Sequence, residues 1–339
     1  MYKYKVAVII PCYNAEKYIS RCLDSVVSQS FSDLQIIFVD NLSTDSSASI
    51  VSSYAQSDKR ILIVTSHNKG LPYAINDGLA ACDAEYVCFI DADDYIKTDA
   101  IERLYSATKK YDADIVQCNY CRILIDGTEE VMNCFTEEKV FTGDDIFEAT
   151  IRMVNFYNFM DPARGNGFFS HSRWGKLIRS ELLKSNSSIV DLTMSIGEDF
   201  DRMLPVFIDS KVIVALNEVL YYYIKNPTSV TLGWAESRKS DNVKLINNAI
   251  RMTKIKGVYD KFEVPLLHKK CQIDTDYILR VCKQTCPYPE HRKLEEIRSM
   301  KSILNVTGVN YPSVFFRRNT LRLLLRLHAY KLILKLYKG

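Results

Sequence analysis

The sequence lacks a hydrophobic run long enough to cross a bilayer, because no stretch of about 18 apolar residues occurs in it. It also lacks a large excess of charge of either sign, since the formal net charge is +3 over 339 residues. A membrane-spanning helix and a nucleic-acid partner are therefore not expected. With 47% hydrophobic residues, the chain can bury one large core or two moderate ones.

The cysteines lack the repeating frame of a disulfide-rich or zinc-binding protein. Ten are present, and the short-spaced pairs Cys118/Cys121 and Cys282/Cys286 have neither a second matching pair nor a histidine at ligand spacing. We interpret them as buried thiols. No secretory signal precedes the first expected strand, so the reducing cytoplasm is the expected compartment.

Short apolar runs alternate with helical patterns in the first third of the sequence. Strands are predicted at residues 6–10, 35–39, 61–64 and 86–90, with amphipathic segments between them. This alternation predicts a parallel α/β sheet with right-handed connections. The carboxyl ends of parallel strands share one edge, so the loops after the first, second and fourth strands should meet there.

An acidic cluster follows the fourth predicted strand, where Asp91-Ala92-Asp93-Asp94 places three carboxylates within four residues. Asp91 and Asp93 would lie on the same side of an extended backbone. There they could bind a hard divalent cation whose further ligands are diphosphate oxygens. An Asp-rich turn or a helix cap is the alternative, and the pattern leaves both open.

A second acidic pair, Glu198-Asp199, precedes a segment of helical spacing that begins at Phe200. Acidic residues favour the first turn of a helix, which is a purely structural explanation. The same position would favour the carboxylate form that a general base needs near neutral pH. Both interpretations can hold together.

Three segments, residues 8–16, 39–45 and 90–94, together resemble the family 2 glycosyltransferases of the GT-A fold. The resemblance covers roughly the first 115 residues. It implies a Rossmann-like α/β fold for nucleotide-diphospho-sugars, with a mixed sheet flanked by helices and a helical extension after it. It also implies an inverting, metal-dependent enzyme that moves one hexose or N-acetylhexosamine from a nucleotide sugar, with UDP as the expected nucleotide.

The resemblance assigns a nucleotide site to the loops after the first two strands. Pro11, Tyr13 and Asn14 follow the first strand and would hold the nucleotide. Asp40 follows the second strand and would accept a hydrogen bond from the uracil ring N–H. Tyr13 and Asn14 could instead simply pack against and cap the first helix.

The resemblance also assigns the metal ligands and the base. Asp93 would be the principal ligand of Mn²⁺ or Mg²⁺, and Asp91, next to Ala92, would lie on the ribose side and act as a further ligand. Asp199 matches the acid that usually serves as the family's base, with Glu198 as the fallback. A base on the acceptor side is needed to deprotonate the attacking hydroxyl.

The sequence departs from the family pattern at three positions. Asn41 and Leu42 stand where the family commonly has an aspartate and a glycine, and Ile75 stands where it has an arginine. That arginine would lie near the diphosphate or support the acidic cluster. Lys69 is a conjectural source of the missing charge.

Segments 172–178, 221–225 and 229–231 resemble parts of capsule and exopolysaccharide transferases. Trp174 could form a platform under a sugar ring, and Lys176 could contact phosphate oxygens. An isolated tryptophan is otherwise a core residue and a lysine a solvated rim residue. The Gln-x-x-Arg-Trp signature of processive synthases is absent after Glu198-Asp199, so we expect one sugar to be added per encounter.

The sequence after residue 233 is predicted to be mainly helical. We expect a nucleotide-sugar-binding half at 1–115, an acceptor-binding half at 116–233, a helical extension at 234–310 and a basic amphipathic helix at 311–339. This last helix could lie on an anionic leaflet, which would suit a lipid-linked acceptor at the inner face of the cell membrane. It could instead dock on its own domain or on a second subunit.

The proposed acceptor is a lipid-linked or growing bacterial surface glycan, such as a capsule, an exopolysaccharide or an O-antigen, as the resemblance implies. A non-catalytic scaffold that binds nucleotide or glycan within an assembly complex is the alternative function. The complete acidic set Asp91, Asp93 and Glu198-Asp199 favours the enzyme.

Overall fold

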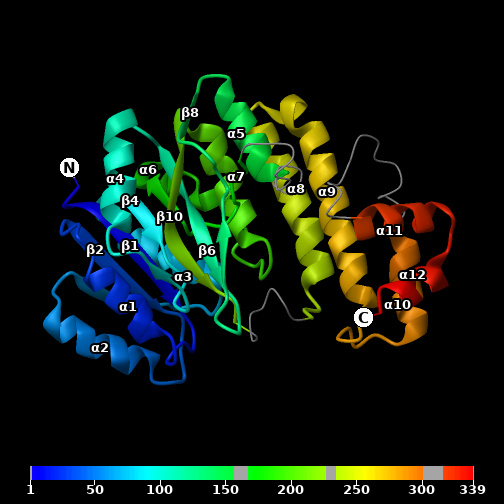
Figure 1. The fold of residues 1–339 in the computed structure, drawn as a ribbon, viewed down its shortest axis with the longest axis horizontal. Coiled ribbons are helices and arrows are strands. Elements are labelled where there is room, and N and C mark those ends of the chain that lie inside the picture. The colour runs from blue at the N-terminus through cyan, green and yellow to red at the C-terminus, as the bar shows by residue number, and fades with distance from the viewer. Residues whose placement is uncertain (1, 156–166, 227–233, 301–315, 339) are drawn as a thin grey trace. The chain divides into compact units, whose positions relative to one another are not determined.

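The apolar runs of the first third form the parallel half of one sheet in the computed structural model, which describes residues 2–155, 167–226, 234–300 and 316–338 (Figure 1). The four strands, in their order across the sheet, are β3 (Ile61–Thr65), β2 (Leu34–Asp40), β1 (Tyr4–Cys12) and β4 (Ala84–Phe89). All of their pairings are parallel. The predicted parallel half is therefore present.

The other half of the sheet makes it mixed. Strand β9 (Lys176–Arg179) lies between β4 and β6 (Ile115–Ile123) and is antiparallel to both. Beyond β6 lie β10 (Val212–Ile224), which is parallel to it, and the short strands β5 (Tyr95–Ile96), β7 (Glu129–Met132) and β8 (Lys139–Thr142). A mixed sheet is the predicted fold class, which is thereby confirmed.

Helices pack on this sheet. They are α1 (Ile19–Val27), α2 (Ser47–Ser57), α3 (Leu71–Ala80), α4 (Ala100–Tyr111), α5 (Asp145–Val154), α6 (Ser180–Ser185) and α7 (Glu198–Asp209). Helix α1 buries Ile19, Leu23 and Val26 in the core cluster that includes Val8 and Ile10 of β1. Every third or fourth residue of α1 is apolar, so burial of this stripe holds the helix on the sheet.

Helix α3 packs unusually close to the sheet because it contains Gly78. A Cβ atom on Gly78 would lie 2.6 Å from Cγ2 of Ile9 and 3.1 Å from Cγ2 of Val39. These residues belong to β1 and β2. The absent side chain therefore lets the helix approach the two strands whose ends carry the candidate site.

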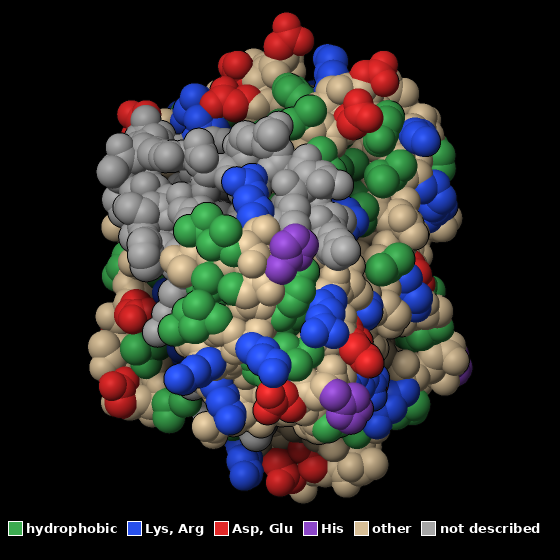
Figure 2. Space-filling view, turned by 90° about the vertical axis from the view of Figure 1, so that its right-hand side faces the viewer, with side chains coloured by type: hydrophobic (Ala, Val, Ile, Leu, Met, Phe, Trp, Pro, Cys, Tyr) green, Lys and Arg blue, Asp and Glu red, His purple; other side chains and the backbone are tan. Residues whose placement is uncertain are grey.

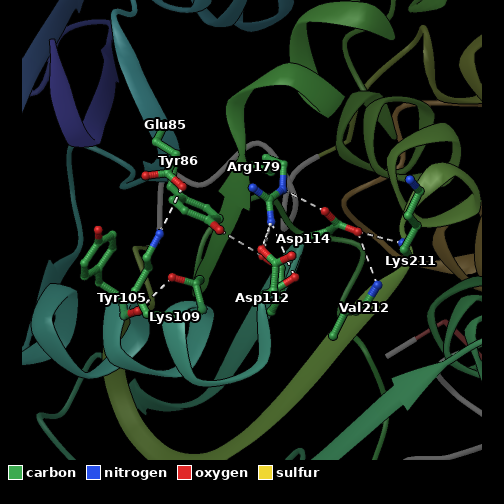
Figure 3. A network of polar contacts seen from close by, with 11 residues as sticks. Glu85, Tyr86, Tyr105, Lys109, Asp112, Asp114, Arg179, Lys211 and Val212 are labelled. Carbon is green, nitrogen blue, oxygen red and sulfur yellow. Dashed lines mark hydrogen bonds and ion pairs between the residues drawn. The ribbon is translucent and has the colours of Figure 1, made fainter. Parts of the chain in front are cut away.

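A polar network ties the strands together at the edge opposite to the predicted site (Figure 3). Arg179 of β9 donates to Asp114 and Asp112, at 2.8 Å each, and its guanidinium lies 5.1 Å from the ring centroid of Tyr86. Asp114 also accepts from the backbone N–H groups of Lys211, at 2.6 Å, and Val212, at 3.2 Å. The network fixes the start of β6 and β10 and is structural.

The chain divides into two compact units, Met1–Met153 with Asn166–Pro227, and Val154–Gly165 with Thr228–Gly339. In the second unit the described elements are α8 (Arg238–Ile255), α9 (Tyr259–Cys282), α10 (Glu290–Ser299), α11 (Phe316–Arg326) and α12 (Tyr330–Leu336). Their core includes Tyr277, Ile297, Leu321 and Ile333. The predicted helical extension is thus confirmed.

Two expectations from composition can be checked against these elements. All ten cysteines are buried and free, as the interpretation as buried thiols requires. Among the described residues, no helix is both long enough and apolar enough to cross a bilayer.

Candidate active site

The loops after β1 and β2 are joined by reciprocal hydrogen bonds. The N–H of Asn14 donates to Oγ of Ser43 at 3.1 Å, and the N–H of Thr44 donates to Oδ1 of Asn14 at 2.8 Å. The N–H of Glu16 donates to a carboxylate oxygen of Asp45 at 3.0 Å. Asn14 adopts a left-handed φ of 51°, which asparagine tolerates better than most residues. Asn14 therefore holds the loop together.

The predicted base-binding residues lie side by side at this edge. Pro11 is buried in β1, and Cys12 pairs in register with Asp40 at the end of β2. Asp40 is 8% exposed, and its Oδ1 accepts the N–H of Ser43 at 3.0 Å. Tyr13 is 45% exposed, so part of its ring is accessible to solvent.

The departures from the family pattern at this edge have structural roles. The side chain of Asn41 donates to the carbonyl of Asn68 at 2.9 Å and accepts the N–H of Gly70 at 2.7 Å, which ties the loop after β2 to the loop after β3. Leu42 has a φ of 64°. Lys69 donates to the hydroxyl of Tyr13 at 2.8 Å and lies 4.3 Å from its ring centroid, so its charge is beside the predicted base platform.

Asp94 is an anchor of the acidic cluster. Its side chain is fully buried, and it accepts hydrogen bonds from the hydroxyl of Tyr221 at 2.6 Å and the N–H of Ile224 at 2.8 Å. The hydroxyl of Tyr221 also accepts the N–H of Asp91 at 3.2 Å. Asp94 therefore fixes the loop after β4 against β10, which agrees with the turn interpretation for this one residue.

Asp91 and Asp93 remain half-buried at the surface of the loop. Burial raises the pKa of both carboxyls, and Arg173 opposes the shift at Asp91. A carboxylate that is poorly solvated gains from a nearby cation. No group of three or more His, Cys, Asp or Glu side chains suited to a metal ion occurs among the described residues. One or two carboxylates fit a Mg²⁺-like ion only if substrate phosphates and water complete its coordination.

Arg173 is the residue that connects the two acidic motifs. An isolated bridge between Phe89 and Trp174 brings the segment before β9 alongside the end of β4. The Arg173 side chain is only 2% exposed and donates to the carboxylates of Asp91 and Asp199, the latter at 2.7 Å. Its distance to Glu198 is 3.4 Å. One buried guanidinium therefore faces three acids from two separate motifs.

The charges around Arg173 set the protonation of its neighbours. Burial opposes the charge of Arg173, but Asp91, Asp199 and Glu198 outweigh it and raise the pKa of the guanidinium. Burial, together with the charge of Asp199, raises the pKa of Glu198. Of the two acids, Asp199 makes the shorter contact with Arg173. Burial favours the protonated form of Glu198.

The helix-start interpretation of this motif also holds. Helix α7 begins at Glu198, after Gly197 with a φ of 86°. Glu198 and Asp199 lie in its first turn, where the unpaired N–H groups of the helix favour negative charge. The structural and the chemical interpretations of Glu198-Asp199 therefore coexist.

A second buried arginine, Arg202, lies one turn further along α7. It donates to Oδ1 of Asn76 at 2.8 Å, and burial with the nearby charge of Arg173 lowers its pKa to about 10. Ile75, which replaces the family's arginine, is 1% exposed in α3. Arg202 thus places positive charge beside Asn76 of α3, and Arg173 places positive charge beside Asp91. Neither arginine was predicted from the sequence.

Trp174 belongs to an aromatic stack. It lies parallel to Tyr221, at 4.7 Å between ring centroids, and to Tyr223, at 5.5 Å, and meets Tyr120 edge-on at 4.9 Å. Trp174 is only partly buried. Trp174 is thus held in place by three tyrosines next to Arg173, and its role as a sugar platform stays a prediction.

Lys176 does not fit the predicted contact with phosphate oxygens. Its side chain is fully buried, and its ammonium donates to the carbonyl of Ser172 at 2.6 Å. Burial lowers the pKa of Lys176 to about 7, and the charge of Asp199 opposes that shift. Lys176 therefore acts from the interior, by holding the Ser172–Arg173 turn, and its burial fits neither the predicted phosphate contact nor the alternative of a solvated rim residue.

Comparisons with known proteins agree with this geometry. The family model described as Glycosyl transferase family 2 matches residues 7–172. The chain is 33% identical over 233 residues to the glycosyltransferase GlyA of Streptococcus pneumoniae, in a match that covers 68% of this chain and 32% of GlyA. It is 30% identical to the uncharacterized glycosyltransferase EpsJ of Bacillus subtilis, over 67% of this chain and 62% of EpsJ. The matches thus span about a third and three fifths of these two relatives.

Solved structures show the same fold. The crystal structure of S. aureus TarS 1–349 in complex with UDP-GlcNAc has a TM-score of 0.64 to this chain, with 98% of this chain and 89% of that chain covered. Its sequence identity of 18% supports a shared fold and nothing finer. Together with the family match, the likeness confirms the resemblance inferred from the three motif segments.

Proposed function

Because the chain belongs to glycosyl transferase family 2, we propose that it is an inverting, metal-dependent glycosyltransferase. It moves one hexose or N-acetylhexosamine from a UDP-linked donor to a lipid-linked or growing bacterial surface glycan. The observation that carries this proposal is the shared guanidinium of Arg173, which brings the donor-side acid Asp91 and the candidate base Asp199 together. The bound UDP-GlcNAc in TarS supports the choice of nucleotide.

The donor binds across the ends of β1, β2 and β4. Tyr13 stacks on the uracil ring while Asp40 accepts its N–H, because an exposed ring and a carboxylate lie side by side at this edge. Asp93, with Asp91, would hold Mn²⁺ or Mg²⁺. When bound, the ion stabilises the negative charge that develops on the departing diphosphate.

Asp199 removes the proton from the acceptor hydroxyl as its oxygen attacks the anomeric carbon. The new glycosidic bond forms on the face opposite to the breaking bond, whose electron pair leaves with the nucleoside diphosphate, so the configuration is inverted. Arg173 orients Asp199 through the 2.7 Å contact. Trp174 supports a sugar ring from below.

The proposal is tested by UDP release from a panel of nucleotide sugars, with and without Mn²⁺ or Mg²⁺, and with membrane-extracted glycolipids as acceptors. Metal-dependent release from one donor is expected, and Asp199→Asn should lower kcat by at least about 100-fold. Asp93→Ala should abolish the metal-dependent release of UDP. Asp126→Asn, in an exposed turn, is the matched control and should behave as the wild type.

A protein that binds UDP without turnover of any donor, and whose Asp199→Asn variant is indistinguishable from it, would instead be the non-catalytic scaffold. The binding arm of the experiment is therefore run with UDP alone, by calorimetry. The two functions differ in turnover while sharing the nucleotide site, so this pair of measurements separates them.

A further inference from the structure

Helices α11 and α12, the last two elements that the structure describes, carry two separate sets of apolar side chains. One set lies in the core of the helical unit and consists of Leu321, Leu324, Leu325, Ile333 and Leu334. The other set is exposed and consists of Leu323 at 55%, Leu327 at 65%, Leu332 at 45% and Leu336 at 56%. Packing against the rest of the helical unit therefore explains why the first set is apolar, but it does not explain why the exposed second set is apolar.

The exposed leucines form pairs at helical spacing. Leu323 lies on α11 and Leu327 in the turn directly after it, where the N–H of Leu327 still donates to the carbonyl of Leu323 at 3.0 Å. Leu332 and Leu336 are four residues apart on α12, so the members of each pair point to the same side of the chain. Exposed apolar residues are common singly, but repeated pairs on adjoining helices are typical of a binding surface. We call these four side chains, with the basic residues beside them, the leucine–lysine face.

The basic residues of this face are exposed as well. They are Arg326 at the end of α11, and Lys331, Lys335 and Lys338 in and after α12. The sequence from Phe316 to Gly339 contains no aspartate or glutamate. Figure 2 shows hydrophobic and basic side chains on the side of the molecule turned to the viewer, with acidic side chains from other elements among them. The face therefore combines apolar surface with charge of a single sign.

These features select one occupant. We propose that the leucine–lysine face docks on an anionic lipid surface, with the leucines at the boundary of the acyl chains and the basic groups among the headgroups. Interfacial helices with leucines on one face and long basic side chains beside them bind such surfaces. A symmetric contact between two copies would oppose like charges, which disfavours it. Helix α11 has 11 residues and α12 has 7, so each lies along the surface and neither can span it.

The test is cosedimentation of the 339-residue protein with vesicles, measured without any sugar donor or acceptor. Vesicles of phosphatidylcholine are compared with vesicles that also contain about one third phosphatidylglycerol, and we expect about 10-fold or tighter binding to the latter. Binding should weaken as salt is added, because the basic residues act through screened charge. Since no glycosyl transfer is measured, failure here is independent of the proposed function.

Two variants test the leucines and the lysines of the face separately. Replacement of all four exposed leucines by serine should lower binding to anionic vesicles about 10-fold or more. Lys331→Glu with Lys335→Glu should do the same by reversing the charge. Both variants should keep the thermal unfolding midpoint of the wild type, since the altered side chains are exposed.

Matched controls use exposed residues elsewhere. Val264→Ser with Leu267→Ser removes apolar side chains from α9 that are 57% and 44% exposed. Lys5→Glu with Lys59→Glu reverses two exposed charges in the sheet unit. Neither control should alter vesicle binding.

Three outcomes would overturn the proposal. The first is no binding of the wild type to anionic vesicles, and the second is equal binding to neutral and anionic vesicles. The third is a four-leucine variant that binds vesicles as the wild type does. If that variant instead changes the oligomeric state in size-exclusion chromatography with light scattering, and vesicles are not bound, the face is a contact between copies.

Discussion

At the scale of single residues, the candidate site depends most on Arg173. Taking a guanidinium out of water is costly unless well-placed acids compensate for it. Here Asp91 and Asp199 both contact the buried guanidinium of Arg173. The contact with Asp91 therefore helps to fix the guanidinium that orients Asp199. We therefore regard Arg173 as a positioning residue for the proposed base.

Arg173→Gln should lower kcat/KM by about 100-fold and move the acidic limb of its pH profile to higher pH. The positive charge of Arg173 favours the ionised forms of Asp91 and Glu198, so its removal raises the pKa values of these two acids, and Asp91 is then ionised only at higher pH. The measurement is donor-dependent UDP release between acidic and alkaline pH. Arg179→Gln disrupts the ion pairs at the opposite edge of the sheet and should lower stability with an unshifted pH profile. An unshifted profile for Arg173→Gln would refute the positioning role.

Glu198 should make folding stability depend on pH. Burial raises the pKa of Glu198 to about 8, so the unfolded chain ionises this group at lower pH than the folded protein does. The stabilisation that comes from the protonated form is fully present below the pKa of Glu198 in the unfolded chain. It is lost as the pH rises through the pKa of Glu198 in the folded protein. Glu198→Gln should therefore gain about 1–3 kcal/mol over the wild type on going from pH 5 to pH 8.

This second prediction is measured by urea unfolding of both proteins at several pH values. A difference in unfolding free energy that does not change with pH would contradict it. The same variant should retain most of its UDP-release activity, in contrast to Asp199→Asn. If both variants lost activity equally, Glu198 would share the role of the base.

Sequence reasoning could identify the acids of this site but not the arginines. Asp91, Asp93 and Glu198-Asp199 stand out because several carboxylates at a strand end or a helix start form a local pattern. Arg173 stands alone between Ser172 and Trp174, and its burial depends on a bridge to β4 that no local pattern indicates. Lys176 was misplaced for the same reason, since its burial follows from the position of β9 in the middle of the sheet.

At the scale of elements, the close approach of α3 to the sheet gives a sharp test of packing. Gly78→Ala places a methyl group 2.6 Å from Ile9 and 3.1 Å from Val39, so the helix must shift away from both strands. We expect a loss of about 1–3 kcal/mol in unfolding free energy. Ser53→Ala, at an exposed position of α2, should change stability far less. If Gly78→Ala and the wild type were equally stable in urea unfolding, the space between α3 and the two strands would accommodate a methyl group without cost.

The first four strands were predictable because each is a short apolar run between turn signals. Strands β1, β2 and β4 are largely buried, whereas the edge strand β3 leaves Leu62 and Ile63 exposed. Strand β1 extends beyond the predicted run 6–10 by two residues at each end, whereas β4 begins two residues before the predicted run 86–90 and ends one residue before it does. The four-residue strand β9 was not predicted. It pairs with β4 and β6, which lie far from it in sequence, so only the tertiary fold defines it.

At the scale of the whole molecule, both acidic motifs belong to the sheet unit, while the leucine–lysine face belongs to the helical unit. The complete set of proposed donor and base residues therefore lies in one compact unit. Substitutions in the leucine–lysine face should leave unchanged the release of UDP from the donor when the acceptor is water-soluble. The two proposals can accordingly be tested in one protein without one masking the other.

The last prediction concerns coupling between metal and nucleotide. Because no group of three suitable side chains occurs in the described residues, we expect these residues to offer a cation only one or two carboxylates and the diphosphate to complete its coordination. Mn²⁺ alone and UDP alone should each raise the unfolding temperature only slightly, and the two together should raise it by more than the sum. At a concentration of about 100 times the dissociation constant, a ligand stabilises the fold by about 2.7 kcal/mol. Asp93→Ala should abolish the excess, and additive shifts in the wild type would argue that metal and nucleotide bind independently.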